Sequence, residues 1–422
     1  MYRKTILNNK VRVITHDMKE RDSVVIGIWV SSGGRYEVDN LKGIAHFLEH
    51  ILFKGSRKYA CEEIKEKIEG VGGSLNAFTT EEQTCYYAKI PSQHIEKTLD
   101  ILADMVIYPL ITKKDVGKER GVILEEIKMY HDLPQYFVLE LLDEMMWPNH
   151  PLGKNLAGTA ETVSRITEKD LKAFHRKHYT AGHIVVAACG KIKHEHIVDL
   201  VKKKLADAGD SEKVDFLKAQ NSQEAPTAQF FGKATEQMHV ALGMMGLDEN
   251  HQDKYALNLL HIILGGNMSS RLFDVVREKK GLAYSISSYV KSLSDTGMFM
   301  VRAGVDNHKI VEAMDVILKE LRKIKRSGVR PGEFKRAKEY YAGQVLLGLE
   351  DTLDHMLWLG DALMTRDEPR TLQEVIEKVN EVTIADIERV AHDILQEKRF
   401  NLAIVGPVEE TQKKQLSGLL GM

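Results

Sequence analysis

Two histidines and a glutamate stand close together in the stretch GIAHFLEHILFK, residues 43–54. The order is HxxEH, with His46 and His50 four residues apart and Glu49 directly before the second histidine. In an α-helix, residues four apart lie on one face, so a helix would bring the two imidazoles together. Neutral imidazole nitrogens bind zinc, and a neighbouring carboxylate can accept a proton from a water molecule. The spacing therefore predicts part of a zinc hydrolase site, with Glu49 as the general base.

The same motif has a simpler interpretation. Its flanking residues are apolar, which predicts a largely buried helix, and such a helix can carry two core histidines and a glutamate in an internal salt link. Three titratable groups on a buried helix are costly unless something pairs with them. This cost favours a bound metal ion over the internal salt link.

A catalytic zinc ion usually takes a third protein ligand, and the best candidates lie in KERGVILEEIKMY, residues 118–130. Glu119 and Glu126 are seven residues apart, or two helical turns, whereas Glu125 shares its face with two lysines. We assign Glu126 as the ligand and Glu119 as a carboxylate that orients a ligand histidine. Periodicity alone does not decide which of the two binds the metal. Their shared face also carries Val122, Ile123, Met129 and Tyr130.

Composition narrows the class of protein. A chain of 422 residues is too long for one ordinary core, so two or more domains are expected. A net charge of -2 gives no electrostatic case for binding nucleic acid or an anionic membrane. The N-terminal residues 1–17 contain no long apolar run, so no signal peptide is expected, and no stretch approaches the roughly 20 apolar residues that span a bilayer. Three cysteines suit a reducing compartment, so we expect a cytoplasmic protein.

Hydrophobic patterning predicts the elements of the first half of the chain. The run SVVIGIWV, residues 23–30, is mainly β-branched and apolar, which is typical of a central strand. Other strands are expected at 2–7, 10–16, 74–80, 83–90 and 184–189, and helices at 43–54, 61–71, 92–108, 112–132 and 167–178.

The second half of the chain repeats this order, which indicates a duplicated α+β domain. Strands are expected at 238–246, 285–290 and 297–303, and a helix at 253–264 takes the place of the HxxEH helix. That helix carries His261 alone, which we interpret as a core histidine, so only the first half should bind metal. We expect similar domains at 1–209 and 228–422, each a mainly antiparallel sheet packed with helices, joined by a polar linker at 210–227.

These features resemble the pitrilysin/insulinase family of zinc metallopeptidases, in the two-domain branch that includes the mitochondrial processing peptidase. HFLEH matches the family's HxxEH motif, and Glu126 lies 126 − 50 = 76 residues past His50, where the family has its third zinc ligand. The resemblance implies that His46, His50 and Glu126 hold one zinc ion per chain. It also implies that Glu49 is the catalytic base, that Glu119 supports the ligands, and that the two domains face each other as a clamshell.

Another stretch, GGSLNAFTTEEQTCY at 72–86, resembles the strand on which the family binds its substrate. The resemblance implies that Asn76, Ala77 and Phe78 line the site and that the strand's free edge pairs with a peptide backbone. Such β-augmentation binds extended peptides with little regard to their sequence. The alternative is an ordinary edge strand.

The second half contains GGNMSSRLFDVVREKKGLAY, residues 265–284, which resembles the segment that supplies an arginine and a tyrosine to the family's site. Here these are Arg277 and Tyr284, and either can donate a hydrogen bond to a developing oxyanion. The alternative for Arg277 is a surface salt bridge. Gly265 and Gly266 resemble the glycine-rich loop that guides substrate in processing-peptidase relatives.

The resulting hypothesis is a zinc endopeptidase that hydrolyses unfolded peptides or leader peptides inside a closed chamber. The complete motif in one chain favours a homodimer or monomer over an obligate heterodimer. Two other classes stay open: a non-catalytic structural subunit of a larger assembly, and a zinc hydrolase acting on amides other than peptides. The ligand set also tolerates manganese or cobalt.

Overall fold

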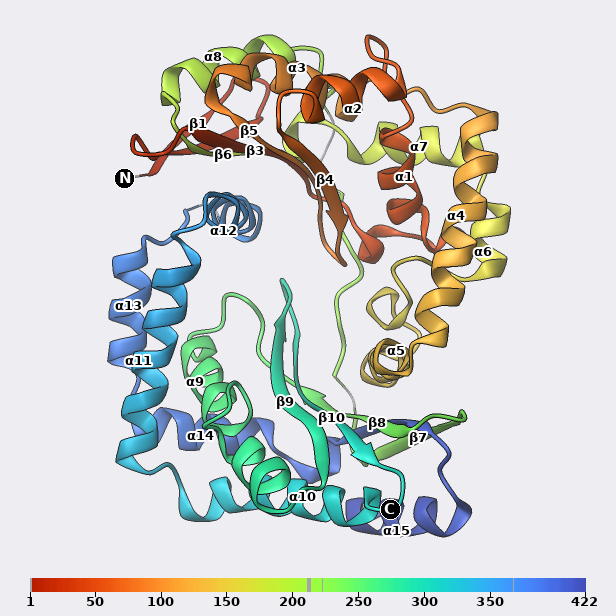
Figure 1. Ribbon diagram of the computed structural model, residues 1–422, viewed down its shortest axis with the longest axis vertical. Helices are drawn as coiled ribbons and strands as arrows, with labels where there is room; N and C mark the ends of the chain where they lie inside the picture. The colour runs from red at the N-terminus through yellow and green to blue at the C-terminus, as the bar shows by residue number, and fades with distance from the viewer. Residues whose placement is uncertain (1, 211–213, 222, 367) are drawn as a thin grey trace. The chain divides into compact units, whose positions relative to one another are not determined.

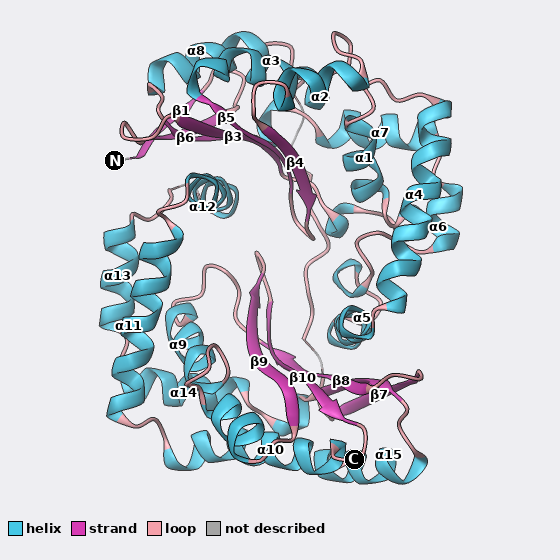
Figure 2. Ribbon diagram, viewed as in Figure 1, coloured by secondary structure: helices cyan, strands magenta, loops and turns pink. Residues whose placement is uncertain are grey.

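The computed structural model describes residues 2–210, 214–221, 223–366 and 368–422, and these form two compact units (Figure 1). Unit 1 comprises Met1–Ile127, Lys154–Leu217 and Leu346–Thr371, and unit 2 comprises Lys128–Gly153, Lys218–Val345 and Leu372–Met422. Each unit contains one sheet packed with helices, which confirms the expected α+β class (Figure 2). Residues 211–213 and 222 of the expected linker lie outside the described residues, and its described part before Thr227 is neither helix nor strand.

The sheet of unit 1 has six strands in the order β1-β2-β6-β3-β5-β4. Neighbouring strands are antiparallel except β2 and β6, which are parallel. The strands expected in the first half of the chain are therefore confirmed, with β3 in the interior of the sheet and β4 at one edge. Their bounds are β1 Tyr2–Ile6, β2 Arg12–Asp17, β3 Ser23–Val30, β4 Ser74–Thr79, β5 Thr84–Pro91 and β6 Ile184–Gly190.

Strand β3 is apolar or glycine from Val24 to Val30 because both of its faces are buried there. Val24, Ile26 and Ile28 pack into the core beneath the helical layer of unit 1. Val25 and Trp29 point to the opposite face of the sheet, into a second apolar cluster. The helices that begin in this half of the chain are α1 Ile44–Leu52, α2 Cys61–Glu69, α3 Ile95–Ile107, α4 Lys113–Asp132, α5 Pro134–Met146, α6 Ala160–Arg165, α7 Glu168–His178 and α8 His194–Lys204.

The sheet of unit 2 has the order β7-β11-β8-β10-β9, with β7 and β11 parallel and the other neighbours antiparallel. This repeats the order β2-β6-β3-β5-β4 of unit 1, as expected for a duplicated domain. Its strands are β7 Thr227–Gly232, β8 Gln237–Met245, β9 Ala283–Ser292, β10 Gly297–Asp306 and β11 Asn401–Gly406. The helices of the second half are α9 Lys254–Leu264, α10 Ile310–Ser327, α11 Pro331–Gly348, α12 Thr352–Thr365, α13 Leu372–Glu381, α14 Ile384–Ile394 and α15 Glu410–Leu420.

Each half of the chain contributes one helix to the unit that the other half mainly builds. Helix α5 packs on β8 and β11 of unit 2, and helix α12 packs on β2, β3 and β6 of unit 1. The expected division at 1–209 and 228–422 assigned α5 to the first domain and α12 to the second. The observed contacts instead place α5 in unit 2 and α12 in unit 1. Each helix covers a sheet face that would otherwise expose apolar side chains to water. No helix among the described residues is long and apolar enough to cross a bilayer.

The contact between α12 and β3 predicts the effect of a substitution at Gly360. A Cβ atom there would lie 2.2 Å from two atoms of the Trp29 indole ring, which is 1% exposed and has no room to move. Gly360→Ala should therefore lower the free energy of unfolding by about 1–3 kcal/mol, measured by urea denaturation.

Gly343→Ala is the matched control, because it lies within helix α11 and a Cβ there meets nothing within 4 Å. It should leave stability unchanged or raise it by up to about 1 kcal/mol. Equal effects of the two substitutions would contradict the packing of α12 on this sheet.

Candidate metal centre

Helix α1, which carries the HxxEH motif, is held at its N-terminus by a buried carboxylate. Glu37 accepts hydrogen bonds from the backbone amides of Gly43, at 3.0 Å, and Ala45, at 2.8 Å. The ammonium of Lys42, also buried, lies 3.2 Å from the same carboxylate. Gly43 has φ +93°, a left-handed conformation that favours glycine. Together these contacts set where the helix starts, and hence which way each side chain of the motif points.

The histidines of α1 face helix α4, which belongs to the same half of the chain. The Oε2 atom of Glu126 lies 3.8 Å from Nε2 of His46 and 3.6 Å from Nε2 of His50. All three donor atoms lie within 4.8 Å of one another. Two donors bound tetrahedrally to one zinc ion are about 3.4 Å apart. Two imidazole nitrogens and a carboxylate oxygen at this spacing therefore fit a catalytic zinc ion.

The protonation of His46 suits a metal ligand. Burial, together with the neighbouring His50, lowers the pKa of His46 to about 4. Its imidazole is therefore neutral near pH 7 and offers a lone pair to a metal ion. No charge on this histidine opposes the approach of a cation.

A second carboxylate lies behind His50. The Nδ1 atom of His50 is 3.3 Å from Oε2 of Glu119, and Nζ of Lys54 is 2.7 Å from the other oxygen. A carboxylate that bonds the second nitrogen of a ligand histidine fixes its ring orientation. The structure thus places Glu126 at the two Nε2 atoms and Glu119 one layer behind, a choice that periodicity left open. Of the remaining residues on that predicted face, Ile123 is buried, whereas Val122 and Met129 are half exposed.

Glu49 also points toward this cluster and is fixed by a residue that the sequence analysis did not identify. The hydroxyl of Thr79, at the end of β4, donates a hydrogen bond to the Glu49 carboxylate. Burial raises the pKa of Glu49, and the hydrogen bond from Thr79 opposes part of that rise. A carboxylate with a raised pKa is a stronger base than one in water. No sequence spacing links the two residues, because the fold alone brings β4 against α1.

The expected substrate strand is at the edge of its sheet, because β4 pairs with β5 on one side alone. The amide of Ala77 donates to the side chain of Asn76 at 2.8 Å, so this amide points away from the β4–β5 ladder. Phe78 packs edge-on against Trp29, with ring centroids 5.4 Å apart. The outer edge of β4 at Asn76 and Ala77 thus pairs with no other described strand, and the Ala77 amide on it is held by the Asn76 side chain. The ring of Phe78 belongs instead to the core contact with Trp29.

The expected residues of the second half lie together within unit 2. Arg277 is in a π-helical turn, Phe273–Lys279, a conformation often found at functional sites. Its guanidinium is 5.7 Å from the ring centroid of Tyr284, and Tyr284 is 74% exposed. The Nε atom of Arg277 also lies 3.7 Å from the carboxylate of Glu278. The pair Arg277 and Tyr284 is thus one local cluster whose tyrosine is open to solvent.

The glycine pair next to α9 is closely packed. A Cβ at Gly265 would lie 2.5 Å from the backbone nitrogen of Ser288, and one at Gly266 would lie 3.1 Å from the ring of His261. His261 is hydrogen-bonded to the Ser288 hydroxyl at 2.8 Å, and burial lowers its pKa to about 4. This confirms the interpretation of His261 as a core histidine. Among the described residues, the three-ligand cluster in the first half is the one group placed to hold a metal ion.

Two family models match the chain. Residues 12–160 match the model described as insulinase (peptidase family M16), and residues 165–341 match the peptidase M16 inactive domain. An uncharacterized zinc protease of Streptomyces coelicolor is 37% identical over 426 residues, which cover 98% of this chain and 91% of that protein. The uncharacterized zinc protease YmxG of Bacillus subtilis is 35% identical over 407 residues, covering 96% and 98%.

Solved structures share the fold. A protease from Helicobacter pylori superimposes with a TM-score of 0.91 at 23% identity, covering 96% of this chain and 99% of that one. A peptidase M16 inactive domain from Pseudomonas fluorescens gives a TM-score of 0.90 at 19% identity, covering 97% and 98%. At these identities the likeness concerns the architecture of the chain.

The geometry predicts which glutamate of α4 controls metal content. Glu126→Gln removes the carboxylate that faces both histidines, whereas Glu125→Gln changes an exposed neighbour on the same helix. After dialysis, the Glu125 variant should retain about one zinc ion per chain and the Glu126 variant far less, as measured by atomic emission. Equal zinc content in the two variants would remove Glu126 from the ligand set.

Proposed function

The chain belongs to the insulinase family of peptidases, peptidase family M16, and from this premise we propose that it is a zinc-dependent endopeptidase. Its substrates are unfolded peptides or leader peptides, as for a processing peptidase. The observation that carries this proposal is the convergence of His46, His50 and Glu126 on one point, with Glu49 directed to the same side of α1.

Zinc, when bound by these three residues, supplies Lewis-acid chemistry that polarises a carbonyl and makes water more acidic. Glu49 accepts the proton of the attacking water and later donates it to the departing amine. Thr79 keeps the Glu49 carboxylate in place during both transfers. Glu119 holds the ring of His50, and Lys54 balances the charge of Glu119.

Substrate binding is proposed at the free edge of β4. An extended peptide can pair with the backbone of Asn76 and Ala77 as an added strand, which leaves the choice of side chains loose. Only an unfolded segment has the backbone groups free to pair in this way. From the family resemblance we also propose that a closed chamber encloses the peptide during cleavage.

The cluster in unit 2 completes the proposal. Arg277 and Tyr284 carry hydrogen-bond donors within one local cluster, and such donors stabilise the oxyanion that forms as the carbonyl is attacked. Gly265 and Gly266 follow helix α9 on the same unit and are proposed to guide the peptide. One zinc ion per chain follows from the single three-ligand cluster among the described residues.

Assembly and location complete the description of the proposed enzyme. We propose a homodimer or a monomer, because one chain carries the whole ligand set and the base. A cytoplasmic location fits the three cysteines, all of which are free thiols.

The decisive variant for the proposed chemistry is Glu49→Gln. It keeps the size of the side chain and removes the base, so kcat on a quenched, unstructured peptide should fall by about 10²–10⁴-fold. Zinc content should stay that of the wild type, because Glu49 is not one of the three ligands. Full activity in this variant would exclude Glu49 as the base, and zinc bound with no cleavage by the wild type would favour the structural subunit.

The hydrogen bond from Thr79 predicts a smaller effect on the same reaction. Thr79→Val removes the donor while keeping the shape, so kcat should fall about 10-fold with KM nearly unchanged. Thr79→Ser restores a hydroxyl at the same place and should recover most of the loss. A Ser variant as slow as the Val variant would show that packing, rather than the hydrogen bond, matters at this position.

A further inference from the structure

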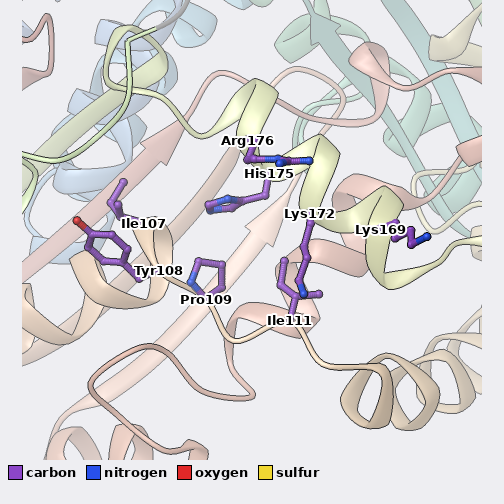
Figure 3. Close-up of a pocket in the computed structure, with 8 residues that line it drawn as sticks. All are labelled: Ile107, Tyr108, Pro109, Ile111, Lys169, Lys172, His175 and Arg176. Carbon is purple, nitrogen blue, oxygen red and sulfur yellow. The ribbon is translucent and has the colours of Figure 1, made fainter.

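A groove of about 400 Å³ lies on unit 1 between helix α7 and the loop that follows α3 (Figure 3). This volume is within the range of ordinary small-molecule sites. The floor is apolar and is formed by Ile107, Pro109 and Ile111, with the ring of Tyr108 beside them. None of these residues takes part in the metal centre.

The opposite wall of the groove is cationic. Lys169, Lys172 and Arg176 are spaced three and four residues apart, so they share one face of α7, and all three are exposed. Lys172 is paired with Glu168, whereas no ion pair joins Lys169 or Arg176 to any described residue. Lys172 is drawn toward Ile111 across the groove (Figure 3). The wall thus carries more positive charge than its own acidic neighbour can balance.

The two acidic side chains near the groove, Glu168 and Asp207, are both engaged by neighbouring residues. The pKa of Glu168 lies below its usual value, chiefly through Lys172, with Lys113 and Lys169 adding to the effect. Asp207 accepts a hydrogen bond of 2.6 Å from the Tyr108 hydroxyl, beside the floor of the groove. A net positive wall facing an apolar floor suits a molecule that is anionic at one end and apolar at the other.

Hydrogen bonds fix both sides of the groove, the loop that forms its floor and the helix that forms its cationic wall. The loop is tied to residues 55–57, where Arg57 donates its amide to the Tyr108 carbonyl and the amide of Leu110 donates to the Gly55 carbonyl, each at 2.9 Å. The guanidinium of Arg57 also stacks 3.3 Å from the Tyr108 ring centroid. Helix α7 is tied to the last turn of α3, directly before the loop, by His175, whose Nε2 lies 2.7 Å from the Val106 carbonyl oxygen. A preformed groove loses little conformational entropy when a ligand binds.

We propose that this groove is a binding site for an organic anion, in which Lys169, Lys172 and Arg176 hold a phosphate or carboxylate group and the floor holds an apolar body. The site is separate from the proposed peptidase centre, and its occupancy does not depend on that function. Helix α7 also packs against α1, so the ligand would sit one helix away from the metal-binding histidines.

The test is a calorimetric titration of the purified full-length protein with 1-naphthyl phosphate. Inorganic phosphate and 1-naphthol are titrated separately as the anionic and apolar parts, and 1-naphthoate shows whether a carboxylate serves as well. Saturable binding of 1-naphthyl phosphate is expected, at least about 10-fold tighter than either part alone, because only a molecule with both groups contacts the cationic wall and the apolar floor at once.

Variants locate the binding in the groove. Lys169→Gln/Arg176→Gln removes the two cations that have no ion pair and should weaken binding at least about 10-fold. Lys202→Gln/Lys203→Gln, two exposed lysines on α8 of the same unit, is the matched control and should leave the affinity unchanged. Glu168→Gln removes the opposing charge and should tighten binding a few-fold. The thermal midpoint of each variant confirms that it is folded.

Two results would overturn the proposal. The first is that neither 1-naphthyl phosphate nor 1-naphthoate binds saturably. The second is binding that the Lys169→Gln/Arg176→Gln variant leaves intact. A glutamate-rich peptide is titrated as well, and its binding in the first case would make the groove a peptide-binding surface instead.

Discussion

The buried ion pair between Glu37 and Lys42 is the interaction on which the metal centre depends. It holds the first turn of a nine-residue helix, too short to be stable alone, so the pair and the surrounding core decide how that helix lies. Removing one partner from a buried pair typically costs several kcal/mol, because the other charge is left without a counterion. The orientation of His46 and His50 toward α4 follows from this start.

Local patterning predicted most of the fold because the elements show either a clear hydrophobic period or a short apolar run. Strand β3 was predicted at Ser23–Val30 and observed there, since a strand buried on both faces reads as a nearly continuous apolar run. The exchange of α5 and α12 could not be predicted in the same way. An apolar helix face shows that something must cover it, but contains no information on which sheet it covers.

The same limit applies to the site. Helical spacing placed the histidines together and selected Glu119 and Glu126, because those relations lie within single helices. Thr79 was missed, since its contact with Glu49 spans 30 residues and exists only when β4 lies against α1. In the duplicated unit the equivalent helix forms no metal site. Helix α9 takes the place of α1, and its single histidine, His261, is hydrogen-bonded to Ser288 in the core.

The most direct test of the account is a paired measurement of bound metal and peptide cleavage on the wild-type protein. The protein is purified without a metal-affinity tag, its zinc is counted, and a quenched unstructured peptide is offered before chelation, after chelation and after zinc is restored. A zinc endopeptidase should carry about one zinc ion per chain and should lose cleavage on chelation and recover it with zinc. No bound metal and no cleavage, even with zinc added, would contradict the account and return His46 and His50 to the role of core residues.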